Sequence, residues 1–443
     1  MSAPRVVGEL DPSFAWDGVR LYEGEDLAPD RDPPSSLAGA AASVSASPER
    51  ERWRIVRDPL GLNKLFWAAG ANDQIFVAAR PWLLVEHGHA LDEIAAVPRG
   101  LVLDVDSTES GTSSLSLVPD AWSTPPPEDI DIEVAGREIR DRLDRYLAAV
   151  AHRHPGASVF VCLSGGLDSS GIAALVADHF PGAVAVSFDL TRPAGARSED
   201  RRVAARLAGD LGLPLLEVTV TPDELLEPLD IVLREGVDWR DFNVHAALVN
   251  AALARGIADA TESAGPSSLV LTGDLANEFL ADYQPERYGD KTYYPLPRLE
   301  PVALRSLLVR GLDTCHREVG VFGAWALALI QPYAVAVDTY MRLPGTFLRI
   351  RDRKERLCRA IFGNAIPDYV FMRDKTRAQV GGSGAEGGVL AICIDRGIDA
   401  SALRQRFAQL HCVAGESSLD RFIRAGLYRA RIPSIRGSSV ERA

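Results

Sequence analysis

A run of small polar residues, Ser164–Ser170, offers the clearest chemistry in this chain. It reads Ser-Gly-Gly-Leu-Asp-Ser-Ser and follows the apolar run Val159–Leu163, which has the length of a buried parallel strand. Apolar residues then recur at helical spacing. Glycines let backbone N–H groups approach phosphate oxygens, a helix N-terminus adds partial positive charge, and serine hydroxyls add donors. The pattern predicts a pyrophosphate cradle, with Asp168 as a ligand for Mg²⁺.

The loop differs from a Walker loop because no Gly-Lys-Ser/Thr follows it. It resembles the SGGxDSS loop of the ATP pyrophosphatases, which include the asparagine, β-lactam and GMP synthetases. The resemblance implies ATP and Mg²⁺ as cofactors and cleavage of ATP between its α and β phosphates. An ordinary strand-to-helix turn rich in small residues is the alternative reading. The nucleotide-binding residues that the resemblance implies are Leu163, Ser164, Gly165, Gly166, Leu167, Asp168, Ser169, Ser170, Ser187 and Gly273.

The elements around the loop predict an α/β fold. A second buried strand is expected at Ala183–Phe188, a helix beginning after Ser198, and a third strand at Leu215–Val218. This β-α-β-α-β alternation is typical of a doubly wound parallel sheet, which binds ligands at the carboxyl ends of its strands. In the family, main-chain groups at Leu163 and Ser187 would hold the adenine.

A second segment, Ser268–Phe279, reads as a strand that runs into a turn and a helix. It resembles the second motif of the family, LSGEGSDE or LTGYGSD. The resemblance gives Asp274 the place of a catalytic Glu or Tyr, and Asn277 the place of a Mg²⁺-binding Asp. We therefore expect Asp168, Asn277 and Glu278 to form the metal site, although Asn is a weaker ligand than a carboxylate. The alternative for Asp274 is a helix cap.

Two further residues complete the expected catalytic set. Glu318 matches a glutamate that activates the attacking amine in β-lactam synthetases, with a surface carboxylate as its alternative. Lys375 matches the family lysine that stabilises charge near the α-phosphate. Between them, the sequence predicts a long apolar helix from Trp325 to Leu343, and we interpret the basic run Arg351–Arg356 as a solvated helix face. The glycine-rich segment Gly381–Gly388 is expected to close over the nucleotide.

Residues 1–125 are predicted to form a β-rich domain, separate from the synthetase domain at residues 126–443. Short β-prone runs end at turn signals, and Asn72–Asp73 predicts a hairpin between two of them. Arg57–Leu65 resembles the RDxxGxxPL signature of the glutaminase domain of asparagine synthetases, with Lys64 in place of Pro. The expected fold is a degenerate sandwich of the N-terminal nucleophile type.

This domain is not expected to hydrolyse glutamine. Working glutaminases of the class carry an N-terminal cysteine, and this chain has Ser2. Residues 29–48 are rich in small residues and are expected to form a loop. A proline-rich linker at residues 124–129 leads to a helix that Asp129 or Asp131 would cap. Its apolar face is expected at Val134, Ile139, Leu143, Leu147 and Val150.

The composition of the chain limits the kinds of partner that it is expected to bind. The chain has 443 residues, 47% of them apolar, and a net charge of −13, which argues against binding nucleic acid. Its five cysteines form no C-x-x-C pair, and no signal peptide or membrane span is expected, so we predict a cytoplasmic protein. The histidines lack metal-ligand spacing. The oligomeric state is open, with a homodimer among the options.

These observations predict an AMP-producing ligase that forms carbon–nitrogen bonds without glutamine. A small-molecule carboxylate would be adenylated, and an amine or ammonia would then displace AMP, between molecules or within one to close a ring. Secondary-metabolite or antibiotic biosynthesis is the expected setting. Two alternatives are another use of the loop, such as sulfur transfer or nucleotide amidation, and an inactive homologue that serves as a binding or scaffold protein.

Overall fold

The computed structural model describes parts of both expected regions of the chain. The described residues are 5–6, 42–46, 52–58, 60–70, 75–106, 113–117, 130–191, 197–261, 268–312, 317–373, 388–411 and 439–440. Several predictions lie outside these residues: the nucleophile position at Ser2, the linker at 124–129, Lys375 and most of the glycine-rich segment.

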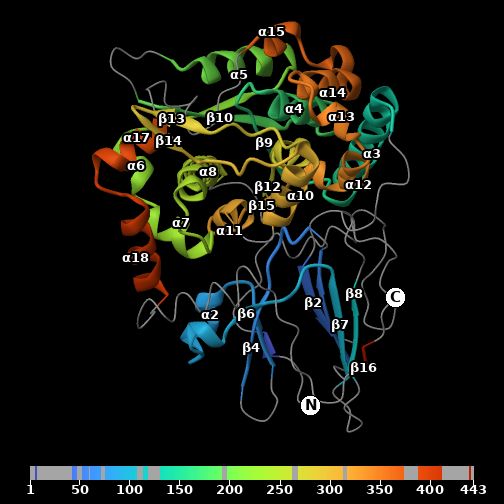
Figure 1. Ribbon diagram of the computed structural model, residues 1–443. Coiled ribbons are helices and arrows are strands. Elements are labelled where there is room, and N and C mark those ends of the chain that lie inside the picture. The colour runs from blue at the N-terminus through green and yellow to red at the C-terminus, as the bar shows by residue number, and fades with distance from the viewer. Residues whose placement is uncertain are drawn as a thin grey trace.

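A parallel sheet forms the centre of the larger region (Figure 1). Its strand order is β11-β10-β9-β12-β15, and every neighbouring pair is parallel. From β9 the chain continues to β10 and β11 on one side of the sheet, and β12 and β15 then lie on the other side of β9. The topological switch point therefore lies between β9 and β12. The predicted doubly wound α/β fold is confirmed. The strands are β9 (Ser158–Cys162), β10 (Val184–Leu190), β11 (Leu215–Val220), β12 (Ser268–Leu271) and β15 (Ala328–Ile330).

Helices cover both faces of this sheet, as Figure 1 shows. One face packs in a core with Ile139, Ile172 and Leu207, and the other with Leu248 and Val319. Helices of the first face are α3 (Ile132–Arg153), α4 (Leu167–His179), α5 (Glu199–Asp210) and α14 (Arg353–Phe362). Helices of the second face are α7 (Leu229–Glu235), α8 (Asp241–Thr261), α11 (Arg317–Gly323) and α18 (Ala400–Leu410).

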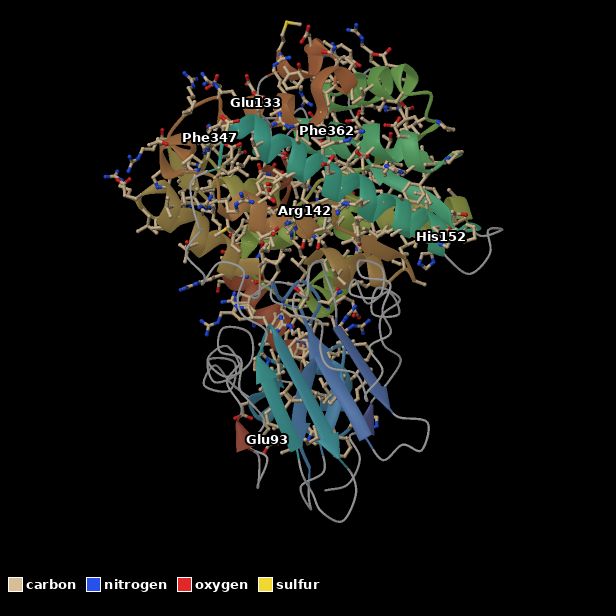
Figure 2. The ribbon with its side chains drawn as sticks, turned by 90° about the vertical axis from the view of Figure 1, so that its right-hand side faces the viewer. Glu93, Glu133, Arg142, His152, Phe347 and Phe362 are labelled. Carbon is tan, nitrogen blue, oxygen red and sulfur yellow. The ribbon has the colours of Figure 1, made fainter. Side chains whose placement is uncertain are left out.

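The long helix α3 begins as the sequence predicts. The side chain of Asp131 accepts hydrogen bonds from the N–H groups of Glu133 and Val134, at 2.9 and 3.3 Å, and so caps the helix. The predicted apolar face is confirmed at four of its five residues, since Ile139, Leu143, Leu147 and Val150 are buried, but Val134 is 37% exposed and its predicted place there is wrong. Figure 2 shows the helix running along the outside of the larger region from Glu133 to His152.

The segment predicted as a helix from Trp325 to Leu343 folds differently. Ala326 has a positive φ of 56°, and β15 then adds a fifth strand to the sheet. Pro332 follows, and its missing N–H and fixed φ separate the strand from the short helices η6 (Pro332–Ala336) and α12 (Val337–Met341). Most of this run is apolar because it is buried as an edge strand and two short helices, so periodicity alone could not distinguish these elements from one long helix.

The described strands of the N-terminal region form two sheets, drawn below the parallel sheet in Figure 1, and a strand from the C-terminal end of the chain joins one of them. The strands β4 and β5 are antiparallel with Ala69 opposite Ile75, which confirms the predicted hairpin. Part of the predicted loop at residues 29–48 forms strand β2 instead. The first sheet contains β16 (Ser439–Val440), β8 (Ser113–Leu117), β7 (Leu101–Asp106), β3 (Arg52–Arg57) and β2 (Ala42–Ala46). The second contains β1 (Arg5–Val6), β5 (Ile75–Ala78), β4 (Phe66–Ala69) and β6 (Ala95–Ala96).

The N-terminal region packs against the helix that carries Glu318. Buried Arg80 donates from Nε to Glu235 on α7 at 2.8 Å and from Nη2 to the carbonyl of Gly320 on α11 at 3.4 Å. Phe66 and Leu84 share a hydrophobic core with residues of α7 and α11. The N-terminal region therefore packs against α7 and α11 and supports the position of α11.

Shorter elements complete the described chain. They are α2 (Pro81–Glu86), η3 (Leu91–Glu93), α6 (Pro222–Leu226), α9 (Ala276–Leu280), β13 (Glu286–Tyr288), β14 (Lys291–Tyr293), α10 (Pro301–Gly311), α13 (Gly345–Leu348), η7 (Gly363–Ala365), α15 (Asp368–Phe371) and α17 (Gly388–Asp395). Within the described part of the chain, no helix combines the length and apolar character needed to cross a membrane.

Candidate active site

The Ser164–Ser170 loop lies at the switch point, between the carboxyl end of β9 and the first turn of α4. Its serines hold its shape: Ser164 N–H donates to Ser169 Oγ at 3.2 Å, and the two hydroxyl oxygens are 3.1 Å apart. Gly166 N–H donates to Ser164 Oγ at 3.3 Å. The loop is thus formed in advance of any ligand, with its glycines and the start of α4 at its rim.

Two glycines allow the elements of the site to approach closely. Gly165 has a φ of +73°, and a Cβ there would lie 2.7 Å from Val203 of α5. A Cβ on Gly273, at the end of β12, would lie 2.6 Å from the backbone nitrogen of Ser169. Both distances are shorter than any contact that a Cβ tolerates, so only glycine lets the second motif lie directly against the first.

The carboxyl ends of the strands open into a cavity of about 1890 Å³. The predicted residues that line it are Leu163, Ser164, Gly165, Gly166, Leu167, Asp168, Ser169, Gly273, Asp274, Asn277, Glu278 and Glu318. Two predicted nucleotide-binding residues, Ser170 and Ser187, are buried and do not line it. The cavity therefore brings together both motifs and the glutamate from α11.

Leu163 and Ser187, the two positions expected to hold the adenine, are less accessible to a ligand than the sequence implied. Ser187 lies inside β10, because that strand continues to Leu190, and its neighbours Val186 and Phe188 line the cavity instead. The N–H of Leu163 donates to the carbonyl of Val186 at 2.8 Å. That donor is used by the sheet, and an adenine bound here would need other main-chain groups.

Asp168 is positioned from both sides. Its main-chain carbonyl accepts from the Tyr333 hydroxyl at 3.2 Å, and its Oδ2 accepts from Lys354 Nζ. Its Oδ1 is buried and has no hydrogen-bond partner among the described residues. A buried carboxylate oxygen of this kind fits a divalent cation, so Asp168 is suited to hold Mg²⁺.

Lys354 is the residue that sequence reasoning missed. It belongs to the basic run interpreted as a solvated face, but its side chain is only 11% exposed and lines the cavity. Its Nζ also donates to Asn277 Oδ1 at 2.7 Å. The solvated interpretation of this run is wrong at Lys354, because the first turn of α14 points this one lysine into the site.

The expected metal set divides into two groups. Asn277 faces Asp168 through Lys354, whereas Glu278 accepts a hydrogen bond from the Tyr283 hydroxyl at 2.5 Å. Glu278 lies in the electrostatic field of Arg317 and Glu318. It therefore belongs with the residues expected to handle the amine.

A cluster of carboxyl groups forms this second group. Burial, together with the nearby charge of Glu318, raises the pKa of Asp274 to about 7. Burial also raises the pKa of Glu278. Arg317 donates from Nε to Glu318 and lies within 3.5 Å of Asn243 Oδ1. A carboxyl group with a pKa near 7 can accept or release a proton at neutral pH, as acid–base catalysis requires.

The tyrosine-rich hairpin β13–β14 forms another part of the cavity wall. Tyr293 and Tyr294 line it, and the Tyr294 hydroxyl contacts Nδ1 of buried His245 at 2.5 Å. Tyr294 has a positive φ of 53°. The hairpin is thereby fixed to α8, and it contributes aromatic surface next to the polar groups of the site.

Arg373 links the loop to the last described residues before the predicted lysine. Its Nη1 donates to the carbonyl of Ser164 at 3.0 Å, and its guanidinium pairs with Asp200 on α5. Lys375 itself lies outside the described residues.

Residues 138–319 match the family model described as asparagine synthase. No curated protein matches the chain. Among solved structures, the NMN synthetase from Francisella tularensis aligns with 69% of this chain and 100% of its own, at 14% identity and a TM-score of 0.31. The NH₃-dependent NAD synthetase from Campylobacter jejuni aligns with 40% of this chain and 74% of its own, at 19% identity and a TM-score of 0.25.

Identities below 20% and TM-scores near 0.3 say nothing about function. The description of residues 138–319 rests on the match to the asparagine synthase family model alone. The matched residues contain both motifs, from the loop at Ser164–Ser170 to Glu318. Residues 138–319 of this chain form an asparagine synthase domain.

Proposed function

We propose that this protein is an ATP-dependent ligase that activates a small-molecule carboxylate as its adenylate and transfers the acyl group to an amine. One observation carries the proposal: the Ser164–Ser170 loop opens into the same cavity as the carboxyl cluster of Asp274, Glu278 and Glu318. The loop suits the departing pyrophosphate, and the cluster suits the incoming amine. Adenylation and amide formation need both functions in one place.

In the first half-reaction, a carboxylate oxygen attacks the α-phosphorus and pyrophosphate leaves. Main-chain N–H groups of the loop and the N-terminus of α4 stabilise the charge that develops on the leaving group. When bound with ATP, a magnesium ion held by Asp168 would neutralise phosphate charge. The family lysine at position 375 is proposed to act at the α-phosphate.

In the second half-reaction, the amine attacks the acyl carbon and AMP leaves. The nucleophile must be neutral, so a proton has to be removed from the ammonium form. Asp274 has a pKa of about 7 and is therefore suited to take that proton. Burial is the main cause of this raised pKa, and the charge of Glu318, which is held by Arg317, raises it further.

The amine comes from solution or from the substrate itself in this proposal. Ser2 stands where a glutaminase of this class has cysteine, so glutamine is not proposed as the donor. The substrates are proposed to be small metabolites of a secondary pathway, and the protein to act in the cytoplasm.

Substrate-dependent exchange of labelled pyrophosphate into ATP tests the first half-reaction. A panel of amino and hydroxy acids is supplied with Mg-ATP, and AMP formation is then followed with ammonia, alkylamines or glutamine. We expect exchange with a carboxylate alone, and AMP release that needs an amine but not glutamine. Formation of ADP would contradict the mechanism, and strict dependence on glutamine would contradict the assignment of the donor. Nucleotide binding without exchange across the panel would favour the scaffold alternative.

A further inference from the structure

An ammonium group occupies the space between the two motifs. Lys354 Nζ donates to Asp168 Oδ2 of the first motif and to Asn277 Oδ1 of the second, across sequence separations of 186 and 77 residues. A third oxygen, Asp282 Oδ2, lies 4.0 Å from the same nitrogen. The lysine side chain is 11% exposed, so water contributes little to its surroundings.

Neighbouring contacts hold this lysine in place. Arg353 precedes it and donates to the carbonyls of Leu280 and Ala281, at 3.0 and 2.8 Å. Arg353 also pairs with Asp282 at 3.2 Å. The first turn of α14 is therefore tied to the end of α9, which keeps the backbone of Lys354 next to Asn277 and Asp168.

The oxygens around the ammonium are of the type that bind Mg²⁺. Carboxylate and amide oxygens are its preferred protein ligands. Two cations cannot occupy the same position between Asp168 Oδ2 and Asn277 Oδ1, and a buried ammonium cannot be displaced cheaply because its charge would lose its partners. Asn277 adds no charge, so the pair of Asp168 and Lys354 is neutral as it stands.

We propose that Lys354 is a built-in cation that replaces a divalent ion bridging Asp168 and Asn277, so that the site takes one divalent ion per nucleotide, through Asp168 Oδ1. Asn277 is then an acceptor for the lysine and not a metal ligand. The inference rests on the proposed function, since the divalent ion is expected to arrive with ATP.

Counting bound Mn²⁺ by electron paramagnetic resonance tests this directly, with α,β-methylene-ATP as the nucleotide so that no turnover occurs. We expect one Mn²⁺ per chain in the unsubstituted protein. The double variant Lys354→Met/Asn277→Asp exchanges the ammonium for a second carboxylate, and there we expect two. The control Lys291→Met makes the same change at an exposed lysine outside the cavity wall and should leave the count at one.

The single variant Asn277→Asp keeps the lysine and provides the answer if the double variant does not fold. We expect it to bind one Mn²⁺, because the ammonium still occupies the space. Two Mn²⁺ in the unsubstituted protein or in Asn277→Asp would overturn the proposal, as would one in a folded double variant. Failure of the unsubstituted protein to bind the nucleotide at all would contradict the proposed function and this inference with it, whereas two Mn²⁺ with bound nucleotide would contradict this inference alone.

Discussion

Two polar loops of this molecule use their charged side chains in opposite ways. In the N-terminal turn, Arg57 is completely buried and donates to three main-chain carbonyls, those of Asn63 at 2.8 Å, Gly61 at 3.0 Å and Val97. Asp58 accepts from the N–H groups of Leu62 and Asn63. Because both charged side chains are satisfied by main-chain groups, this turn stabilises the fold.

The loop of the synthetase domain keeps part of its capacity unused. Asp168 Oδ1 is buried and has no partner among the described residues, and Asp168 lines the cavity. A buried polar group without a partner costs free energy, so a site that retains one is organised for a ligand that supplies the missing contact. The comparison separates polar residues that build the fold from those that are placed to bind a substrate, and five substitutions test it.

The largest effect is expected at Asp168. Asp168→Asn keeps a hydrogen-bond acceptor for Lys354 but removes the charge that suits Mg²⁺. Loss of one electrostatic contact of this kind lowers rates by about 10³-fold. Pyrophosphate exchange should fall accordingly while the protein stays folded by circular dichroism. Exchange at the unsubstituted rate would show that the loop is not the reacting site.

Arg57→Met should have the reverse outcome. Removing a buried guanidinium leaves its three carbonyl partners without donors, at a cost of about 3 kcal/mol in the free energy of unfolding. Urea denaturation measures this loss. Exchange activity per folded molecule should remain, since Arg57 does not line the cavity. A variant as stable as the original would remove the structural half of the comparison.

Asp274→Asn should lower amide formation by about 10²-fold by removing the proposed base. In the unsubstituted protein, amide formation should rise with pH through about 7, the pKa of Asp274, because only the ionised form accepts a proton. Glu318→Gln removes a neighbouring negative charge, so the pKa falls and the rising limb moves to lower pH. A pH profile that neither variant alters would exclude Asp274 as the base.

The same residue predicts a dependence of stability on pH. The folded-state pKa of Asp274 lies above its unfolded value, so its protonated form stabilises the fold at low pH. This stabilisation is lost as the pH rises through about 7. The thermal unfolding temperature of Asp274→Asn should therefore vary less with pH, between the unfolded-state pKa of 3.8 and the folded-state pKa of about 7, than that of the unsubstituted protein.

The smallest effect is expected in the tyrosine hairpin. Tyr294→Phe removes the hydroxyl that contacts His245 and should cost about 1 kcal/mol of unfolding free energy. Burial lowers the pKa of His245 to about 4, so this contact involves a neutral imidazole. Chemical denaturation at pH 7 measures the cost, and pyrophosphate exchange should change little. A large loss of exchange would place Tyr294 among the substrate-binding residues.

Much of the fold was accessible from the sequence because its signals are local. The runs at β9, β10, β11 and β12 are short, apolar and bounded by turns, and each is a strand of the parallel sheet. Ser198 accepts from the N–H of Arg201 at 3.0 Å, as expected of the first cap of α5. The segment 325–343 was misassigned because an apolar run without alternation does not distinguish a strand from a helix.

The sequence by itself determined the loop, since Ser164, Gly166 and Ser169 specify its shape through hydrogen bonds that span no more than five residues. Only the tertiary structure decided which cation meets Asp168. Lys354 lies 186 residues away and looked like one charge in a solvated run. The packing of α14 against α3 and α4 turns it into the cavity, and that orientation depends on surfaces that no local pattern records. The physical reason is that a lysine's role follows from what buries it, and burial is decided by the whole fold.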